Sequence, residues 1–266
     1  MWGVSRSTVL ESTVQYEPSE TDDGDAVSRN PLDIALLTHR LLPTMELNAN
    51  GTHSKKQVGR LHVISDFYIQ QRLSHAELAE QAIAGGADVI QFRQKRGGIR
   101  NKLIAARKVK AVCEAAGVPL IINDHLDIAQ ALQAGIHLGQ DDFPIDAARA
   151  ILGDGVIIGA TATTPAQAQQ AYEDGADYIG FGPVFTTQTK FNRASVKGLE
   201  GLSAACDAVP IPVIAIAGIT SERVQPALDA GAHGVAVLSA VATATRPERA
   251  TARIRDAVDG AIPSGG

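Results

Sequence analysis

The sequence predicts an α/β fold, a (β/α)₈ TIM barrel preceded by an N-terminal extension. Eight short apolar runs rich in Ile and Val occur from residue 61 onward, and helical segments separate them. The runs are continuous rather than alternating, which is typical of parallel strands buried on both faces. The predicted strands are Leu61–Ser65, Val89–Arg93, Leu120–Asp124, Ile136–Gly139, Val156–Thr161, Tyr178–Gly182, Val213–Gly218 and Gly234–Ser239. An open doubly wound sheet is the alternative, and the number of strands favours the barrel.

Caps at both ends mark the helices between these strands. Ser74 followed by Glu77 predicts a capping box at one helix start, and Thr164 followed by Pro165 and Gln167 predicts another. Glycine at the end of a helix supplies the left-handed residue that closes it. The glycines predicted to do so are Gly85, Gly86, Gly117, Gly135, Gly175 and Gly231. This repeated order of strand, helix and glycine favours a barrel of βα units.

Residues 1–59 form the predicted extension, and residues 60–266 form the predicted barrel domain. Residues 1–30 are polar and acidic without sustained periodicity, which predicts disorder. An apolar stretch within residues 31–46 predicts a short amphipathic helix. Met45 is the second of two methionines, so an alternative is that translation starts there and that residues 1–44 are a misassigned extension.

The composition argues against several classes of function. The chain has 266 residues and a net charge of −5, so it lacks the basic footprint of a nucleic-acid-binding protein. No run approaches the roughly 18 apolar residues of a membrane span, and the start lacks the features of a secretory signal. Cys113 and Cys206 lie in apolar helical segments, where buried, reduced thiols are expected. We expect a cytoplasmic protein with neither nucleic-acid nor membrane partners.

Gln91, Arg93 and Lys95 form the most informative group of residues. They alternate at the end of the second predicted strand, so their side chains share one face. Active sites of such barrels form at the C-terminal ends of the strands. An amide and two cations there predict a site for a multiply charged anion, which Lys190, after the sixth strand, is expected to share. Solvated charges at the barrel rim are the alternative.

Asp124 and Asp142 are the predicted metal ligands. They come from the ends of neighbouring strands, so their carboxylates can converge. Oxygen ligands without Cys or clustered His favour Mg²⁺, with water and substrate phosphates completing its coordination. Cations beside Mg²⁺ suit a diphosphate, whose charge rises as it leaves. The alternative is that Asp142 only caps the helix that begins near Pro144.

Gly218 and Ser239 follow the seventh and eighth predicted strands. Many barrels bind a phosphate there through backbone N–H groups, and Gly218 permits a close approach of the backbone. Ordinary turn chemistry is the alternative. His137 lies within an apolar strand, so we expect a packed, hydrogen-bonded histidine without a catalytic role.

Residues 61–258 resemble the thiamine phosphate synthase family, whose members are (β/α)₈ barrels. Five segments carry the resemblance, and their order and spacing along the barrel make it specific. They are Gln91–Lys95, Ile122–Asp124, His137–Asp142, Gly180–Phe185 with its continuation Thr187–Lys190, and Ala215–Ile219.

The resemblance implies a transferase of thiamine biosynthesis that acts on two phosphorylated small molecules. 4-Amino-2-methyl-5-hydroxymethylpyrimidine diphosphate loses pyrophosphate, and the nitrogen of hydroxyethylthiazole phosphate attacks the exposed methylene carbon of a pyrimidine carbocation. By position, the pyrimidine diphosphate is held by Gln91, Arg93, Lys95, Asn123, Thr161 and Lys190. The thiazole phosphate is held by Thr187, Thr189, Gly218, Leu238 and Ser239. Asp124 and Asp142 bind Mg²⁺, while Arg93, Lys95 and Lys190 are the catalytic cations.

Five positions depart from the usual residues of the family. Gln94 replaces Glu, His125 replaces Arg, Thr161 and Thr163 replace Ser and His, and Ala217 replaces Gly. Thr161 keeps a hydroxyl, so that change is mild. We expect the change at residue 125 to weaken binding of the diphosphate. Ala217 is expected to narrow the approach to the thiazole phosphate if that residue needs a positive φ.

Three other functions stay open at this stage. A thiazole tautomerase of the same superfamily tends to lose the metal carboxylates and the diphosphate cations, which this chain keeps. A non-catalytic barrel that senses a phosphate-bearing ligand would bind without turnover. A barrel for one sugar phosphate would leave Asp124 and Asp142 without a role. The sequence also leaves the oligomeric state open, a homo-oligomer included.

Overall fold

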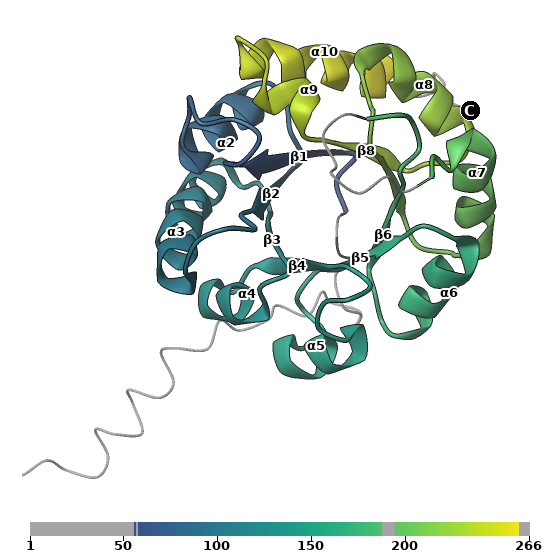
Figure 1. Cartoon of the computed structure of the whole chain (residues 1–266), viewed down its shortest axis with the longest axis horizontal. Helices are drawn as coiled ribbons and strands as arrows, with labels where there is room; N and C mark the ends of the chain where they lie inside the picture. Colours follow the sequence, from purple (N-terminus) through teal and green to yellow (C-terminus); the bar gives the residue numbers. More distant parts are fainter. Residues whose placement is uncertain (1–55, 57, 188–194, 261–266) are drawn as a thin grey trace, which may run out of the picture. The chain divides into compact units, whose positions relative to one another are not determined.

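The computed structural model describes residues 56, 58–187 and 195–260. Within them, eight parallel strands close into a barrel in sequence order, with helices around it (Figure 1). The strands are β1 (Leu61–Asp66), β2 (Val89–Arg93), β3 (Leu120–Asn123), β4 (Gly135–Leu138), β5 (Ile158–Ala162), β6 (Tyr178–Phe181), β7 (Val213–Ile216) and β8 (Gly234–Val237). Because β8 pairs with β1, the predicted (β/α)₈ barrel is confirmed and the open sheet is excluded.

The helices follow the predicted caps with three exceptions. They are α2 (His75–Ala84), α3 (Ile99–Ala116), α4 (Leu126–Leu132), α5 (Ile145–Leu152), α6 (Pro165–Glu173), α7 (Gly198–Ala208), α8 (Ser221–Asp229), α9 (Ser239–Ala242) and α10 (Pro247–Gly260). Ser74 forms the capping box of α2 as predicted. Gly85 caps α2 with a φ of −84°, so only Gly86 of this pair, with a φ of 92°, is left-handed. At α6, Thr164 accepts from the Gln167 N–H, but the Gln167 side chain accepts from Thr163 instead of closing the box. The prediction for Gly135 is wrong, because Gln133 closes α4 at a φ of 49° and Gly135 begins β4.

The strands end earlier than predicted where the backbone turns into a left-handed conformation. Asp124 has a φ of 65° and ends β3, and Ala217 and Gly218 have φ values of 78° and 70° after β7. Such values are incompatible with an extended strand. The functional candidates at these positions therefore lie in loops at the barrel mouth.

The apolar core has two layers. The larger lies between the strands and the helices, and the smaller lies inside the barrel around Ile64, Tyr178, Ile214 and Ala236. A Cβ atom on Gly159 would lie 2.1 Å from Cζ of Tyr178. The absence of a side chain at residue 159 therefore leaves the space that the Tyr178 ring occupies inside the barrel.

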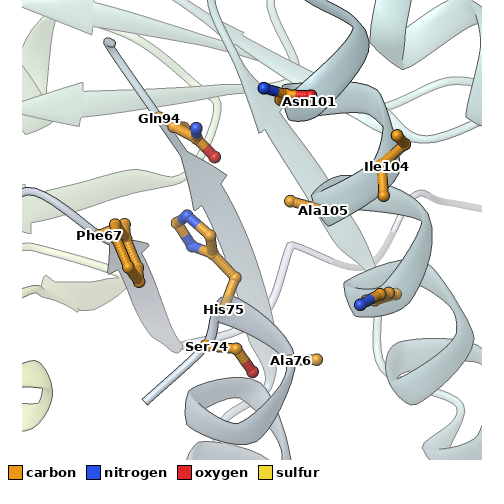
Figure 2. A pocket seen from close by; sticks show the side chains of 9 residues that line it. Phe67, Ser74, His75, Ala76, Gln94, Asn101, Ile104 and Ala105 are labelled. Carbon is orange, nitrogen blue, oxygen red and sulfur yellow. The ribbon is translucent and has the colours of Figure 1, made fainter. Parts of the chain in front are cut away.

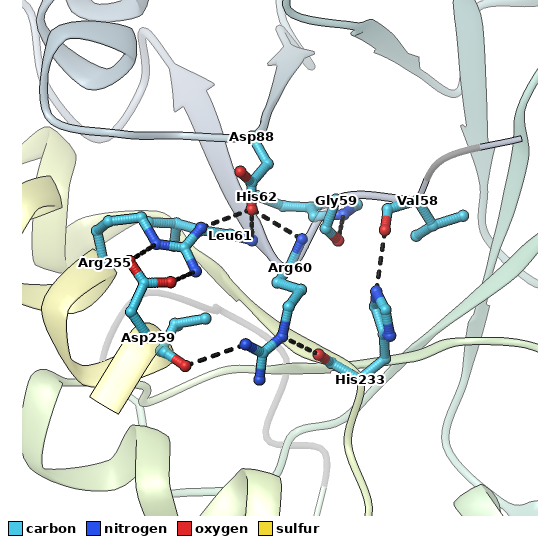
Figure 3. Close-up of polar contacts among 10 residues, drawn as sticks. Val58, Gly59, Arg60, Leu61, His62, Asp88, His233, Arg255 and Asp259 are labelled. Carbon is cyan, nitrogen blue, oxygen red and sulfur yellow. Dashed lines mark hydrogen bonds and ion pairs between the residues drawn. The ribbon is translucent and has the colours of Figure 1, made fainter. Parts of the chain in front are cut away.

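Half-buried carboxylates tie the N-terminal ends of the strands together. Asp88 accepts hydrogen bonds from the backbone N–H groups of Arg60 (2.9 Å) and Leu61 (2.8 Å) and from Nη1 of Arg255 (2.8 Å), which also pairs with Asp259 (Figure 3). These contacts join the start of β1 to the loop before β2 and to α10. The charged groups at this end thus serve the fold.

Asp177 has the same role before β6. It accepts from Nη2 of Arg149 (2.7 Å), from the N–H of Ile158 (2.7 Å) and from Nζ of Lys56 (2.9 Å). Residues 1–55, including the predicted helix at 31–46, lie outside the described residues. The domain boundary at residues 59 and 60 stays a prediction.

The structure also bears on the cysteines and on the helices that could span a membrane. Cys113 is buried in α3 and Cys206 is half-buried in α7, and both are free thiols. Among the described residues, no helix has the length and apolar character needed to cross a membrane.

Candidate active site

The two candidate metal ligands lie together at the C-terminal mouth of the barrel. Asp124 directly follows β3, and Asp142 lies in the loop after β4. Burial, a hydrogen bond with Asp124 and the negative charge of that residue raise the pKa of Asp142. Two carboxyl groups in such contact need a shared proton or a cation between them. The arrangement therefore suits a bound cation.

Asp142 does not cap a helix. Its Oδ2 atom accepts from the backbone N–H of Gly139 at 2.7 Å and so closes the loop after β4. Pro144 precedes α5, and no side chain caps the start of that helix. The capping alternative is wrong, because the Asp142 carboxylate turns back toward β4.

Cations of the predicted anion site accompany these carboxylates. Lys95 donates to Oδ2 of Asp124, and Arg93 donates to Oδ2 of Asp66 at the end of β1. Asp66 is only 1% exposed, so its charge is neutralised mainly through Arg93. The structure thus places Arg93 and Lys95 on the same rim as the acidic pair, as the alternation of residues 91, 93 and 95 predicts.

The donor set fits Mg²⁺ better than zinc. Among the described residues, no cluster holds three or more His, Cys, Asp or Glu side chains, whereas zinc sites take three or four protein ligands, mostly His and Cys. Mg²⁺ commonly takes one or two carboxylates and fills its other positions with water and phosphate oxygens. Asp124 and Asp142 are the residues that would hold it.

Inside the barrel, polar side chains form a connected chain. His137 lies between two hydroxyl groups: its Nδ1 is 3.0 Å from Tyr178 Oη, and its Nε2 is 2.9 Å from Thr161 Oγ1. Burial lowers the pKa of His137 to about 4, so the ring is neutral at physiological pH. The prediction of a packed, hydrogen-bonded histidine is confirmed. Gln91 and Asn123 are also buried, at 5% and 8% exposure, beneath the mouth.

The candidate thiazole-phosphate residues lie after β6, β7 and β8. A Cβ atom at residue 218 would lie 2.6 Å from the carbonyl oxygen of Thr186, so the loops there approach too closely for any residue but glycine. Ala217 does adopt the positive φ that was in question. Leu238 precedes α9, which begins with Ser239. Thr187 belongs to the loop after β6, whereas Thr189 and Lys190 lie outside the described residues.

The Gln94 side chain, at one of the departing positions, lies away from the anion site. Gln94 lines a separate cavity of about 340 Å³ between α2 and α3, together with Phe67 and His75 (Figure 2). Its Nε2 atom donates to the carbonyl oxygen of Arg96 at 3.2 Å. Residues 93 and 95 therefore face the mouth while residue 94 faces away from it, as alternation along an extended chain requires.

His125 and Thr163, which also depart from the usual residues of the family, each contact a nearby side chain. Nε2 of His125 lies 2.9 Å from Nζ of Lys102, a buried lysine on α3 that also donates to the carbonyl oxygen of Lys95 at 3.4 Å. A second amine thus lies next to the backbone of the anion site. Thr163 donates to Gln167 at 2.9 Å and supports the start of α6.

Sequence reasoning missed three residues of this region. Asp66 ends the first strand, so the rule applied to the other strand ends would have found it. Lys102 lies on a helix and Tyr178 begins a strand, and neither has a spacing signal in the sequence. Their partners become apparent only when the barrel closes.

The closed barrel, with paired carboxylates and cations at the C-terminal ends of its strands, defines a phosphate-handling TIM-barrel enzyme. The model of the family described as thiamine monophosphate synthase matches residues 61–241. The chain belongs to this thiamine monophosphate synthase family. The resemblance drawn from the five sequence segments is confirmed.

Individual relatives agree with the family. A thiamine-phosphate synthase of Salinibacter ruber is 65% identical over 216 residues, which make up 81% of this chain and 95% of that protein. A thiamine-phosphate synthase of Natronomonas pharaonis is 42% identical over 72% of this chain and 91% of its own length. The solved structure of a thiamine phosphate pyrophosphorylase from Pyrococcus furiosus matches with a TM-score of 0.70 at 34% identity and covers 77% of this chain and 97% of its own. The predicted synthase function, a transferase activity, is confirmed by these relatives.

Proposed function

We propose that this site joins 4-amino-2-methyl-5-hydroxymethylpyrimidine diphosphate to hydroxyethylthiazole phosphate and releases pyrophosphate. The observation that carries the proposal is the contact between Asp124 and Asp142 beside the cation Lys95 at the barrel mouth. A diphosphate leaving group needs this combination of metal ligands and cations. A tautomerase acting on the thiazole alone does not.

The reaction needs a stabilised leaving group rather than a protein nucleophile. When bound by Asp124 and Asp142, Mg²⁺ supplies positive charge to the diphosphate oxygens. Arg93, Lys95 and Lys190 bind the same oxygens, and their interaction strengthens as the C–O bond breaks and negative charge moves onto pyrophosphate. The thiazole nitrogen then donates its electron pair to the methylene carbon, which forms the C–N bond.

The remaining residues orient the two substrates. Gln91, Asn123 and Thr161 lie beneath the mouth and would hold the pyrimidine ring where water is excluded from the carbocation. On the β6–β8 side, the thiazole phosphate would be bound by Thr187, Thr189, Gly218, Leu238 and Ser239. Holding both molecules in one mouth makes the second step effectively unimolecular and supplies a large share of the rate enhancement.

One assay tests the proposal against its alternatives. The enzyme is given both phosphorylated halves and Mg²⁺, and thiamine phosphate and pyrophosphate are measured. We expect equal amounts of both products, and we expect them to disappear in Asp124→Ala and Lys190→Ala. Isomerisation of the thiazole without coupling would instead support a tautomerase, and saturable binding without either reaction would support a sensor. A cytoplasmic location and a homo-oligomer remain predictions.

A further inference from the structure

The hydrogen-bonded chain inside the barrel extends well below the residues that would touch substrate. Tyr178 begins β6, on the opposite side of His137 from Thr161. The Gln91 side chain hydrogen-bonds the Tyr178 hydroxyl. Four side chains from β2, β4, β5 and β6 are thus linked, and the two at its ends, Gln91 and Thr161, both belong to the proposed pyrimidine site.

The chain is held rigidly. Tyr178 is 2% exposed and fills the space that Gly159 leaves for it. The rings of His62 and His137 flank it, with centroids 5.3 Å and 5.5 Å from the phenol ring. Because the phenol cannot swing away, the imidazole between Tyr178 and Thr161 is fixed in its rotation.

The orientation of the Gln91 amide decides the order of the protons in this chain, because both tautomers of His137 satisfy its two contacts. Burial raises the pKa of Tyr178 and keeps the phenol protonated. We assign the Gln91 amide as the donor to the phenol oxygen. The single proton of Tyr178 then goes to Nδ1 of His137. A neutral imidazole has one donor and one acceptor, so Nε2 of His137 carries its proton and donates to Thr161 Oγ1. Because Thr161 Oγ1 accepts this hydrogen bond, its own proton can be donated to another acceptor.

We propose that Tyr178 is a positioning residue that acts through His137 to make the Thr161 hydroxyl a donor toward an acceptor atom, such as a ring nitrogen, of the bound pyrimidine. This inference rests on the proposed function for the substrate and on the barrel interior for the mechanism. A donating Thr161 hydroxyl would also make the site selective: a ring with an N–H in place of the acceptor nitrogen would place two donors against each other and bind less well. Tyr178 itself touches neither substrate.

A double-mutant cycle tests the coupling. Tyr178→Phe keeps the ring that packs under Gly159 and removes only the hydroxyl, so kcat/KM for the pyrimidine diphosphate is expected to fall about tenfold, with KM for the thiazole phosphate unchanged. In a Thr161→Val background the same change should have a clearly smaller effect, because the link through His137 is already removed. Tyr172→Phe on the exposed face of α6 is the matched control and should leave both constants unchanged. A wild-type kcat/KM in Tyr178→Phe, or an undiminished effect in the Thr161→Val background, would overturn the proposal.

The proton order has its own test, which does not depend on turnover. Nitrogen-15 NMR of the wild-type protein should show His137 as the neutral Nε2–H tautomer, and Tyr178→Phe should weaken that preference. A dominant Nδ1–H tautomer in the wild type would overturn the proposal even if the enzyme is fully active. A protein with the expected tautomer but without coupling activity would instead contradict the proposed function. The two failures are therefore distinguishable.

Discussion

Ala217 is a residue whose backbone conformation conflicts with its side chain. Its φ is 78°, in the left-handed region where a Cβ atom costs roughly 1–2 kcal/mol. Gly218 follows with a φ of 70°, so the turn after β7 contains two successive left-handed residues, and only the second is glycine. Asp124 carries similar strain at the predicted metal site, which is where such conformations tend to gather.

We expect Ala217→Gly to stabilise the protein by about 1 kcal/mol, because the relief of strain outweighs the added freedom of glycine in the unfolded chain. Urea unfolding of the two proteins measures the difference. Ala215→Gly is the matched control: Ala215 is buried in β7 and has no positive φ, so this change should destabilise. A loss of stability in Ala217→Gly would show that the strain account is wrong.

Candidate site residues could be located from the sequence where they lie at the ends of strands. Asp124 and Asp142 could be predicted because parallel strands bring their C-terminal ends to one mouth. The outward orientation of Gln94 follows from the same alternation, although the cavity that it lines could not be foreseen. Lys102 could not be predicted, because its partners His125 and Lys95 come from other elements. The roles assigned to Thr189 and Lys190 stay predictions.

At the element scale, the barrel depends on size matching between facing strands. Gly159 on β5 and Tyr178 on β6 are opposite partners in the register, and the small residue accommodates the large ring. Continuous apolar runs placed the strands within two residues of their observed bounds. The strand ends differed where residues such as Asp124 turn into left-handed conformations, a feature that apolar runs do not encode.

Gly159→Ala should destabilise the protein by about 1–3 kcal/mol, because its Cβ would lie 2.1 Å from the Tyr178 ring, so the ring or the backbone must shift. Thermal or urea unfolding measures the loss. Gly98→Ala serves as the control, since a Cβ there meets nothing within 4 Å and φ is −71°. Equal losses in the two variants would contradict the packing argument.

At the scale of the whole molecule, buried histidines link stability to pH. Burial lowers the pKa of both His62 and His137 to about 4, from an ordinary value of 6.5. Between these values the unfolded chain binds protons that the folded barrel excludes. The stability contributed by their neutral forms is therefore complete above pH 6.5 and is lost as the pH falls toward 4.

We expect the free energy of unfolding to fall between pH 6.5 and 4 by up to about 3 kcal/mol for each of the two histidines. Denaturant unfolding at a series of pH values measures this slope. His62→Gln removes one titrating group, so its slope should be shallower whatever its stability at pH 7. An unchanged slope in His62→Gln would mean that the folded barrel protonates His62 as readily as the unfolded chain does.

Metal binding at Asp124 and Asp142 is the most direct test of the proposed active site. Mn²⁺, as a paramagnetic substitute for Mg²⁺, is titrated into the protein with pyrophosphate and followed by electron paramagnetic resonance. Asp124→Asn and Asp142→Asn are compared with Asp146→Asn, an exposed carboxylate in the first turn of α5. We predict that the first two changes weaken binding at least about tenfold and that the third has no effect. Wild-type affinity in Asp142→Asn would contradict the claim that these carboxylates hold the metal for the departing pyrophosphate.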